Sequence, residues 1–279
     1  MKYANLHLHS TYSDAGFTPW QLVIIGKALG YHALALTDHE TDGGVKEFFK
    51  ATRSEGIQSI AGAEFYGDDF GGKFHIVGLD YDMDNPAIRA FIKKQCDERT
   101  ECTRKCVQRG IDLGFLQGIT WDDVIQDLGE NTWVCIEQVY STLRRKRVMD
   151  LCGGPEAVRQ NCFKGEAKAF SPKHPSATEV IKLIRGAGGI AILAHPYKQT
   201  QYVEKLVEVG LNGIEVSHPD LYENTAALAL EAAETFKLYK SGGTDHTGPM
   251  SCCDGIYAIP AYQGITEEEY TILTERRLG

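Results

Sequence analysis

The chain has 279 residues, enough for one large or two modest domains with a buried core. Asp and Glu (38) outnumber Lys and Arg (29), and the resulting net charge of −9 opposes non-specific binding to nucleic acid or anionic membranes. No apolar run approaches the roughly 18 residues that a membrane span needs, and the N-terminus lacks the hydrophobic core of a signal peptide. We therefore expect a globular, cytoplasmic protein without a stable nucleic-acid partner.

The first 80 residues alternate between strand-like and helix-like segments. Residues 3–9 alternate like a strand, Thr18 and Pro19 are typical of a helix start, and that helix ends at Gly30. Residues 33–37 form a short apolar run, as in a strand buried on both faces. The same reasoning predicts a helix over 45–56 and strands over 58–63 and 74–79. Repeated strand–helix units with short turns indicate a parallel sheet or barrel.

The pattern changes near residue 82, where polar helices replace it. Helices are predicted over 85–108, 121–128 and 135–151. The alternation then resumes with helices over 178–187, 201–209 and 224–236 and strands over 190–194, 213–217 and 238–243. We therefore expect a barrel formed by residues 1–81 and 173–279, interrupted by a helical insertion over residues 82–172.

The eight cysteines contain no C-x-x-C pair. In a chain of this length without a secretion signal, this spacing favours free thiols over disulfides or a zinc site.

Histidines and carboxylates gather at the ends of the predicted strands. His7 and His9 are two residues apart, so on a strand they face the same side. The other members of the set are Asp14, His39, Glu64, His75, His195, His218, Asp245 and His246. The carboxyl ends of the strands in a parallel barrel open on one face, and imidazole and carboxylate donors suit zinc, manganese or iron. A single buried histidine is usually structural, but so many at successive strand ends predict metal binding, and His32 and His174, which lie elsewhere, receive no role.

Five segments together resemble the motifs of the PHP (polymerase and histidinol phosphatase) family. They are residues 5–14 (NLHLHSTYSD), 36–40 (LTDHE), 62–64 (GAE), 193–196 (LAHP) and 242–246 (GGTDH). The chain, with its insertion, is similar to the stand-alone nucleotide- and sugar-phosphate phosphoesterases of that family. The resemblance implies an α/β fold, a distorted (β/α)7 barrel with an inserted small helical domain, which holds two or three divalent ions (Mn, Zn or Fe).

The resemblance also implies the ligand sets. The first ion would be held by His7, His9, Glu64 and Asp245, and the second by Glu64, His75 and His195. The third would be held by Asp14, His39 and a histidine from the last motif. That motif usually reads Asp-x-His, whereas this chain has Thr247 at the expected place and its histidine one residue earlier. His246 is therefore expected either to hold the third ion through a shifted loop, which Gly242, Gly243 and Gly248 would permit, or to act on the substrate as a general acid.

Phosphate needs cationic or hydrogen-bonding partners as well. Arg144, Arg145 and Arg147 form a basic run, which is either a solvated helix face or an edge that binds phosphoryl oxygens. Related phosphoesterases have an Arg-Pro-His-like segment near here, whereas residues 135–138 of this chain read CIEQ. His218 follows a predicted strand and is expected to contact the substrate phosphate or to serve as an acid.

The function predicted from the resemblance is metal-dependent hydrolysis of a small phosphorylated metabolite, by attack of a metal-activated hydroxide on phosphorus. Candidate substrates are a nucleotide bisphosphate, a cyclic sugar phosphate or another phosphomonoester. One alternative is a non-catalytic, metal-stabilised scaffold or regulatory module. A second is a metal-dependent C–N hydrolase, which would require a carbamylated lysine or another histidine pattern.

Overall fold

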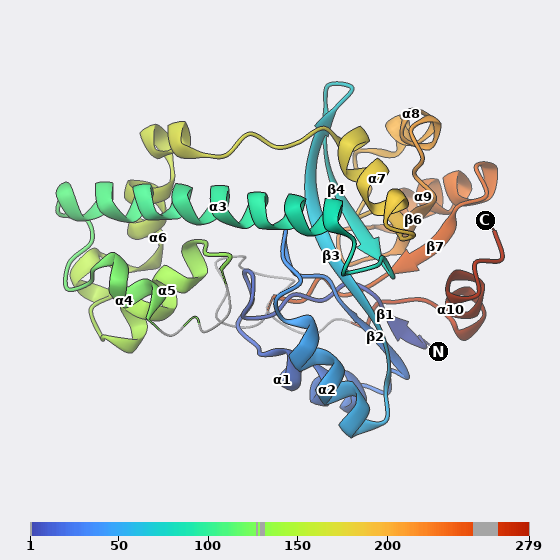
Figure 1. The fold of residues 1–279 in the computed structure, drawn as a ribbon, viewed down its shortest axis with the longest axis horizontal. Coiled ribbons are helices and arrows are strands. Elements are labelled where there is room, and N and C mark those ends of the chain that lie inside the picture. The colour runs from blue at the N-terminus through green and yellow to red at the C-terminus, as the bar shows by residue number, and fades with distance from the viewer. Residues whose placement is uncertain (1, 127, 129–131, 248–261, 279) are drawn as a thin grey trace.

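Seven strands in consecutive order, β1 to β7, curl into a nearly closed barrel in the computed structural model, which describes residues 2–126, 128, 132–247 and 262–278 (Figure 1). The strands are β1 (Ala4–Asn5), β2 (Ala33–Leu36), β3 (Gln58–Asp69), β4 (Gly72–Leu79), β5 (Ile190–Leu193), β6 (Gly213–Ser217) and β7 (Tyr239–Gly242). The first and last strands meet where the Leu6 amide donates to the Gly242 carbonyl at 3.0 Å. The predicted distorted (β/α)7 barrel is confirmed, although β1 is shorter than the strand expected over residues 3–9.

One strand breaks the parallel arrangement that the sequence predicts. β4 runs antiparallel to both β3 and β5, because a tight turn at Phe70 and Gly71 joins β3 directly to β4 without a crossover helix. The resulting hairpin extends beyond the rest of the barrel (Figure 1). As a consequence, the starting half of β4 lies at the same edge as the carboxyl ends of the other strands.

Within the described residues, six helices surround the barrel. They are α1 (Pro19–Ala28), α2 (Val45–Glu55), α7 (Ala177–Gly186), α8 (Val203–Glu208), α9 (Glu223–Thr235) and α10 (Glu267–Thr274). The first begins where the sequence predicts, because the Thr18 side chain accepts from the Gln21 amide and Pro19 occupies the first helical position. Their apolar faces pack on the strands, and this packing fixes the strand ends that carry the polar side chains.

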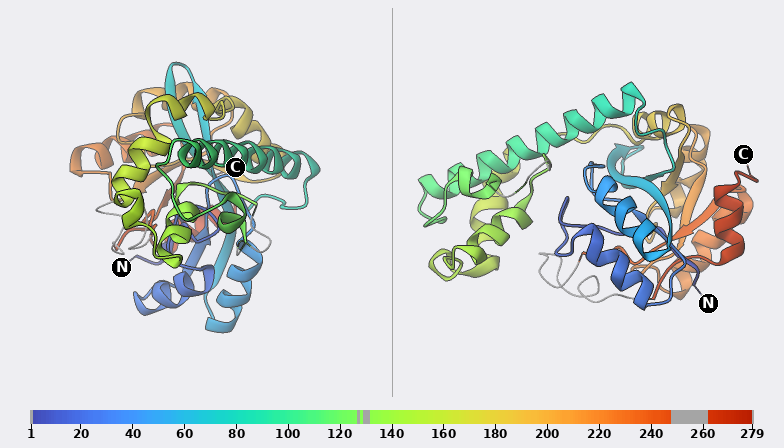
Figure 2. Two further views of the ribbon diagram at one scale, coloured as in Figure 1. Left: turned by 90° about the vertical axis from the view of Figure 1, so that its left-hand side faces the viewer. Right: turned by 60° about the horizontal axis from the view of Figure 1, so that its bottom comes forward.

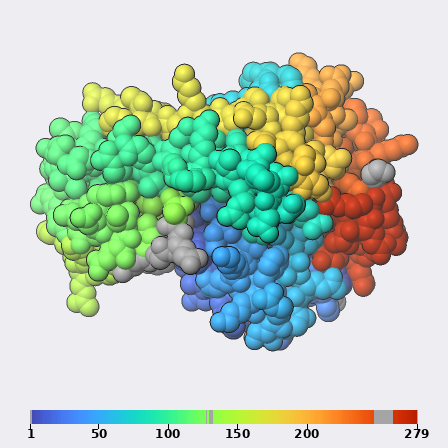
Figure 3. Space-filling view, in the orientation of Figure 1, coloured from blue at the N-terminus to red at the C-terminus, as the bar shows by residue number. Residues whose placement is uncertain are grey.

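The segment between β4 and β5 is helical, and its largest element spans two apolar cores. The helices are α3 (Pro86–Asp112), α4 (Trp121–Ile125), α5 (Ile136–Arg145) and α6 (Gly154–Val158). The first half of α3 contributes Ile88 and Phe91 to the barrel core, whereas Val107 in its second half belongs to a separate core with Val139 and Leu143. The other helices extend to one side of the barrel (Figures 2 and 3). The boundary expected at residue 82 therefore corresponds, in packing, to a position within α3.

The third predicted helix, over residues 135–151, is shorter than expected. α5 ends at Arg145, and Arg147 has a φ of 57°, a left-handed conformation that cannot continue a helix. A separate 3₁₀ turn follows at Asp150–Cys152.

The six described cysteines are free thiols, as predicted, whereas Cys252 and Cys253 lie outside the described residues. Among the helices that the structure describes, none combines the length and apolar character needed to cross a bilayer.

The two ends of the barrel approach each other closely at Gly243. A Cβ atom at this position would lie 2.4 Å from both the backbone nitrogen and the Cβ of His7. We expect Gly243→Ala to lower the free energy of unfolding by about 2 kcal/mol or more, since rigid atoms must move to relieve the overlap. Urea denaturation followed by circular dichroism measures this change.

Gly186→Ala is the matched control for that substitution. It lies in α7, where a Cβ would meet no heavy atom within 4 Å, so we expect unchanged or slightly greater stability. Equal stability of Gly243→Ala and the wild type would contradict the close packing of β7 against the first strand.

Candidate metal centre

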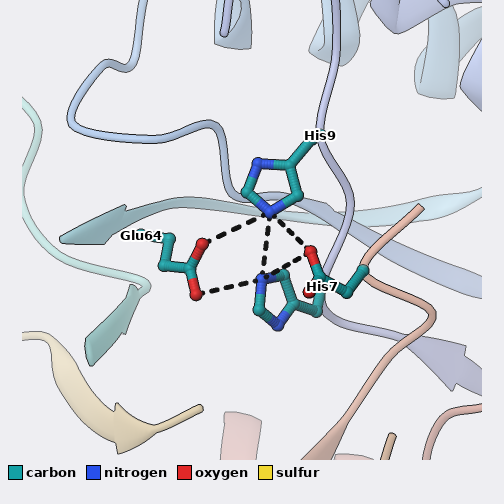
Figure 4. Close-up of side chains that lie close together, drawn as sticks. His7, His9 and Glu64 are labelled. Atoms are coloured by element: carbon teal, nitrogen blue, oxygen red, sulfur yellow. Dashed lines mark hydrogen bonds and ion pairs between the residues drawn. The ribbon is translucent and has the colours of Figure 1, made fainter. Parts of the chain in front are cut away.

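Four side chains converge from three separate parts of the barrel. His7 and His9 follow β1, Glu64 lies in β3, and Asp245 follows β7. Nε2 of His9 lies 3.1 Å from Nε2 of His7, 2.9 Å from Asp245 Oδ1 and 3.3 Å from Glu64 Oε2. Figure 4 shows the two imidazoles and the Glu64 carboxylate pointing toward one another. Both histidines are fully buried, and together the four residues form a group that could hold a metal ion.

Glu215 fixes the orientation of His7. Its Oε1 lies 2.9 Å from His7 Nδ1, and its Oε2 accepts from the His195 amide at 2.7 Å. Burial raises the pKa of the Glu215 carboxyl, but the His7 imidazole and its hydrogen bond lower it, so the pKa lies below its ordinary value. An ionised carboxylate at Nδ1 holds the proton there, which leaves the Nε2 lone pair of His7 facing the other three donors.

The sequence reasoning missed Glu215. The signal for it was a single carboxylate within the otherwise apolar and small residues of the predicted strand over 213–217. A charged residue in such a strand is buried and needs a partner.

A second set of histidines lies on the other side of the Glu64 carboxylate. Glu64 Oε1 is 3.0 Å from His75 Nδ1 and 3.2 Å from His195 Nε2, and these two nitrogens are 3.1 Å apart. His75 reaches this edge because β4 is antiparallel. Burial raises the pKa of Glu64, but His7, His75 and His39 lower it well below its ordinary value. A single ionised carboxylate therefore faces two groups of imidazoles.

A third group consists of His9, Asp14 and His39. Oδ1 of Asp14 lies 3.6 Å from His9 Nδ1, and its Oδ2 lies 3.5 Å from His39 Nε2. The other ring nitrogen of His39, Nδ1, lies 3.0 Å from Glu64 Oε2. The structure therefore brings Asp14 and His39 together, as expected from the resemblance. The second histidine in this group is His9, whereas the resemblance implied a histidine from the last motif.

The structure does not bring His246 into the cluster. Asp245 points into the cluster from a left-handed backbone with a φ of 47°. The His246 ring packs 5.4 Å from the Phe17 ring, and the residue lines a small gap beside Leu22 and Gly26 of α1. The metal-binding groups among the described residues do not include His246, and its expected roles, as a ligand of a third ion or as a general acid, stay predictions. Gly248, which was expected to assist the shift, lies outside the described residues.

His218 does reach the cluster, from the end of β6. Its Nε2 lies 3.3 Å from Asp245 Oδ2, and its Nδ1 accepts from the Asp220 amide at 3.0 Å. With Nδ1 occupied as an acceptor, the neutral ring carries its proton on Nε2 and donates it to Asp245. The side chain has no exposed surface, so this geometry favours orientation of Asp245 over direct contact with a substrate.

The three arginines of the basic run near residue 145 do not all lie in the same surroundings. Arg144 and Arg145 line a cavity of about 530 Å³ together with Tyr12 and Gly16, which belong to the same turn as Asp14. Arg147 is not among the residues that line this cavity, since its left-handed backbone ends the helix before it. The cavity lies beside the turn that carries Asp14, on the side facing α5.

The donor set fits divalent metal ions. Nδ1 of His39 and Oε2 of Glu64 are buried and lie 3.0 Å apart without forming a hydrogen bond among the described residues, so the two atoms are placed to share one cation. Imidazole nitrogen and carboxylate oxygen together suit zinc, manganese or iron. His195 and Asp245 also have positive φ values, 30° and 47°, a conformation that is costly for such residues and common at functional sites.

Comparison with known proteins agrees with this chemistry. Residues 5–114 match the model of the PHP domain. The chain is 27% identical to a phosphoribosyl 1,2-cyclic phosphate 1,2-diphosphodiesterase from Eggerthella lenta, over 92% of this chain and 99% of the relative. It is also 29% identical to a 3',5'-nucleoside bisphosphate phosphatase from Chromobacterium violaceum, over 88% of this chain and 87% of the relative.

A solved structure extends the similarity to almost the whole fold. A protein from Bifidobacterium adolescentis, assigned as a metal-dependent phosphoesterase, superposes with a TM-score of 0.81 at 25% identity, covering 99% of this chain and 96% of the other. The domain match, the two curated relatives and this shared fold agree with the cluster of histidines and carboxylates. Residues 5–114 therefore match the PHP domain, and the chain is similar over nearly its whole length to metal-dependent phosphoesterases.

Proposed function

We propose that this protein hydrolyses a phosphate ester of a small metabolite, such as a nucleotide bisphosphate, a cyclic sugar phosphate or another phosphomonoester. The observation that carries the proposal is the position of Glu64, whose single carboxylate faces two groups of histidines. Pairs of metal ions that share a carboxylate are typical of enzymes that displace groups on phosphorus. The names of both curated relatives, a cyclic phosphodiesterase and a bisphosphate phosphatase, support a small phosphorylated substrate.

We assign the ligands by proximity. The first ion would be held by His7, His9, Glu64 and Asp245, and the second by Glu64, His75 and His195. A third would be held by His9, Asp14 and His39. Divalent manganese, zinc or iron at these places supplies Lewis acidity, which lowers the pKa of water and offsets the negative charge of a phosphoryl group.

Two side chains orient metal-binding residues, and differences in exposure indicate the side from which a substrate enters. Glu215 directs His7, and His218 directs Asp245, so both act as positioning residues. His75 is 30% exposed, whereas His7 and His9 are fully buried. A substrate therefore approaches from the side of His75.

The helical insertion, residues 82–172, would form part of the substrate site. The side-chain amide of Gln138, at the start of α5, donates to the Ser13 carbonyl at 2.6 Å, beside Asp14. The same helix carries Arg144 and Arg145 to the adjacent cavity, where they would contact charged parts of the substrate. A cytoplasmic location is part of this proposal and agrees with the free thiols.

The other two functions predicted from the sequence are less well supported. A scaffold would not need five histidines within 3.4 Å of one buried carboxylate. A C–N hydrolase with a carbamylated lysine would need a lysine in the cluster, whereas the ion pairs of Glu64, Asp14 and Asp245 among the described residues are with histidines.

Metal reconstitution with a phosphate-release screen tests the function. We expect chelated protein to regain hydrolysis with manganese, zinc or iron, and to release phosphate from nucleotide or sugar phosphates, while leaving amide substrates intact. Glu64→Ala should lose at least one bound ion per chain and essentially all hydrolysis, because one carboxylate serves two groups. Elemental analysis by mass spectrometry measures the metal content.

Glu234→Ala is the control for that variant, since Glu234 is an exposed residue whose carboxylate pairs with Lys240. It should keep full activity and metal content. If Glu64→Ala retained both as well, the shared-carboxylate assignment would be wrong. A 5'-phosphorylated oligoribonucleotide belongs in the screen, because preferred cleavage of it would contradict the choice of a small substrate.

Removal of the carboxylate behind His7 should weaken metal binding without removing a ligand. We expect Glu215→Ala to lower metal affinity by about 10- to 100-fold, since His7 loses the partner that fixes its orientation. Titration with a competing chelator measures this. Glu215→Gln keeps an acceptor for His7 Nδ1 and should lose less. Wild-type affinity in Glu215→Ala would show that Glu215 has no part in orienting His7.

The basic residues of α5 provide a separate prediction about substrate binding. We expect joint replacement of Arg144, Arg145 and Arg147 by alanine to raise KM about tenfold for charged substrates, since charge-assisted hydrogen bonds are lost. Metal content should not change. Restoring Arg147 alone should recover nothing, because it does not line the cavity. Unchanged KM and kcat in the triple variant would identify the run as a solvated helix face.

A further inference from the structure

Two cysteines lie one turn apart on α3, within the helical insertion. Cys102 and Cys106 are four residues apart, so their side chains lie on the same face of the helix, and their thiols form a hydrogen bond. Cys106 is buried, whereas Cys102 is only half-buried. One thiol of the pair is therefore accessible, and the other is protected by the packing around it.

The accessible thiol faces a groove on the surface of the insertion. Cys102 lines a groove of about 680 Å³ together with Pro172 and Lys173, which belong to the segment that returns to the barrel. The other lining residues are mostly charged side chains of α3, with both signs present, namely Lys94, Asp97, Glu98, Glu101 and Lys105. A small polar reagent can therefore reach the Cys102 sulfur from solvent.

Neighbouring groups favour the ionised form of this thiol. The hydrogen bond from Cys106 lowers the pKa of Cys102, burial raises it, and the charges of Arg99 and Lys105 lower it again, to about 7. The same hydrogen bond and burial raise the pKa of Cys106, so Cys106 keeps its proton and donates it. The thiolate is the nucleophilic form of cysteine, so Cys102 is reactive near neutral pH.

The other described cysteines are poorer nucleophiles. Burial raises the pKa of Cys96 and that of Cys162 to about 11, and it raises the pKa of Cys135 well above its ordinary value. Cys152 is buried. A redox-sensitive cysteine is accessible, ionised near neutral pH and placed beside a second thiol, and Cys102 meets these three conditions.

We propose that Cys102 is a site of reversible oxidation by hydroperoxides, with Cys106 as its resolving thiol. The Cys102 thiolate attacks one oxygen of hydrogen peroxide, so that an S–O bond forms and the O–O bond breaks. The second oxygen leaves as hydroxide and takes up a proton to become water, while sulfur loses the two electrons that the peroxide gains.

The second step forms a disulfide. The Cys106 sulfur attacks the sulfur of the Cys102 sulfenic acid, an S–S bond forms, and the S–O bond breaks. The oxygen leaves with the proton of Cys106 as a second water molecule. Two thiols and one molecule of hydrogen peroxide thus give one disulfide and two molecules of water.

The helix makes this disulfide easy to reverse. Cβ atoms four residues apart on a helix are about 5–6 Å from each other, whereas the Cβ atoms of a disulfide are about 3.8 Å apart. The turn of α3 between the two cysteines must therefore distort as the bond forms. A strained disulfide of this kind is readily reduced by small thiols.

Peptide mapping without reductant tests the proposal. The purified protein is loaded with zinc, which has no redox chemistry of its own, and exposed to hydrogen peroxide. In protein that remains monomeric, we expect the thiols of Cys102 and Cys106 to be lost, and trypsin to release residues 100–104 linked to residues 106–109. Dithiothreitol should restore both thiols.

Two variants separate the roles of the thiols. Cys106→Ser should accumulate a sulfenic acid at Cys102 that dimedone labels, because serine still donates a hydrogen bond but cannot resolve the product. Cys102→Ser should lose the Cys106 thiol about tenfold more slowly or less, since Cys106 keeps its proton.

Cys162→Ser is the matched control, because it removes a buried thiol from the core of the insertion. It should form the same link between residues 100–104 and 106–109. Wild-type protein that keeps both thiols under these conditions, or that links residues 106–109 to residues 160–164 instead, would overturn the proposal. These measurements follow thiols alone, so the result does not depend on which ester the protein hydrolyses.

Discussion

One buried carboxylate organises the candidate site. Glu64 lies 3.0–3.4 Å from ring nitrogens of five histidines, namely His7, His9, His39, His75 and His195. These histidines come from four different strands or strand ends, so the barrel must hold several separate chain segments in register around one side chain. The close approach at Gly243, the antiparallel β4 and the left-handed backbone at His195 are three local solutions to that requirement. The fold is thus arranged around one carboxylate that several imidazoles share.

The surrounding residues keep those donors correctly oriented. Glu215 holds the proton of His7 on Nδ1, away from the cluster. His218 orients Asp245 by a hydrogen bond from its Nε2 to Oδ2. Farther out, Tyr66 and Trp133 pack against His39 and at the same time against Arg99. The two rings that pack against His39 therefore also hold the Arg99 side chain in place. This shared packing also couples the insertion to the barrel, since Arg99 and Trp133 belong to the segment between β4 and β5.

The periodic and motif signals in the sequence predicted most of the barrel and most of the cluster. Strands such as β2 and β5 are short apolar runs bounded by turns, so their position and the polar residues that follow them could be inferred from the sequence. The antiparallel orientation of β4 could not be inferred from the sequence. The turn at Phe70 and Gly71 is so short that the sequence alone does not distinguish a hairpin from a parallel connection. The packing of His246 beside Phe17 could not be inferred, because the sequence does not show the left-handed backbone at Asp245 that precedes it. Glu215 was missed because its role depends on contacts between distant segments.

The position of the helical segment also bears on how the barrel assembles. β4 and β5 are adjacent in the sheet, yet the whole insertion separates Leu79 from Ile190 in the chain. Closing a long flexible loop carries an entropic cost that grows with its length. The insertion has its own core of contacts close in sequence, and such local contacts form early in folding. Once folded, the insertion replaces a long coil between β4 and β5 with a segment that has its own core. Its helices thereby also reduce the entropy lost when β5 pairs with β4.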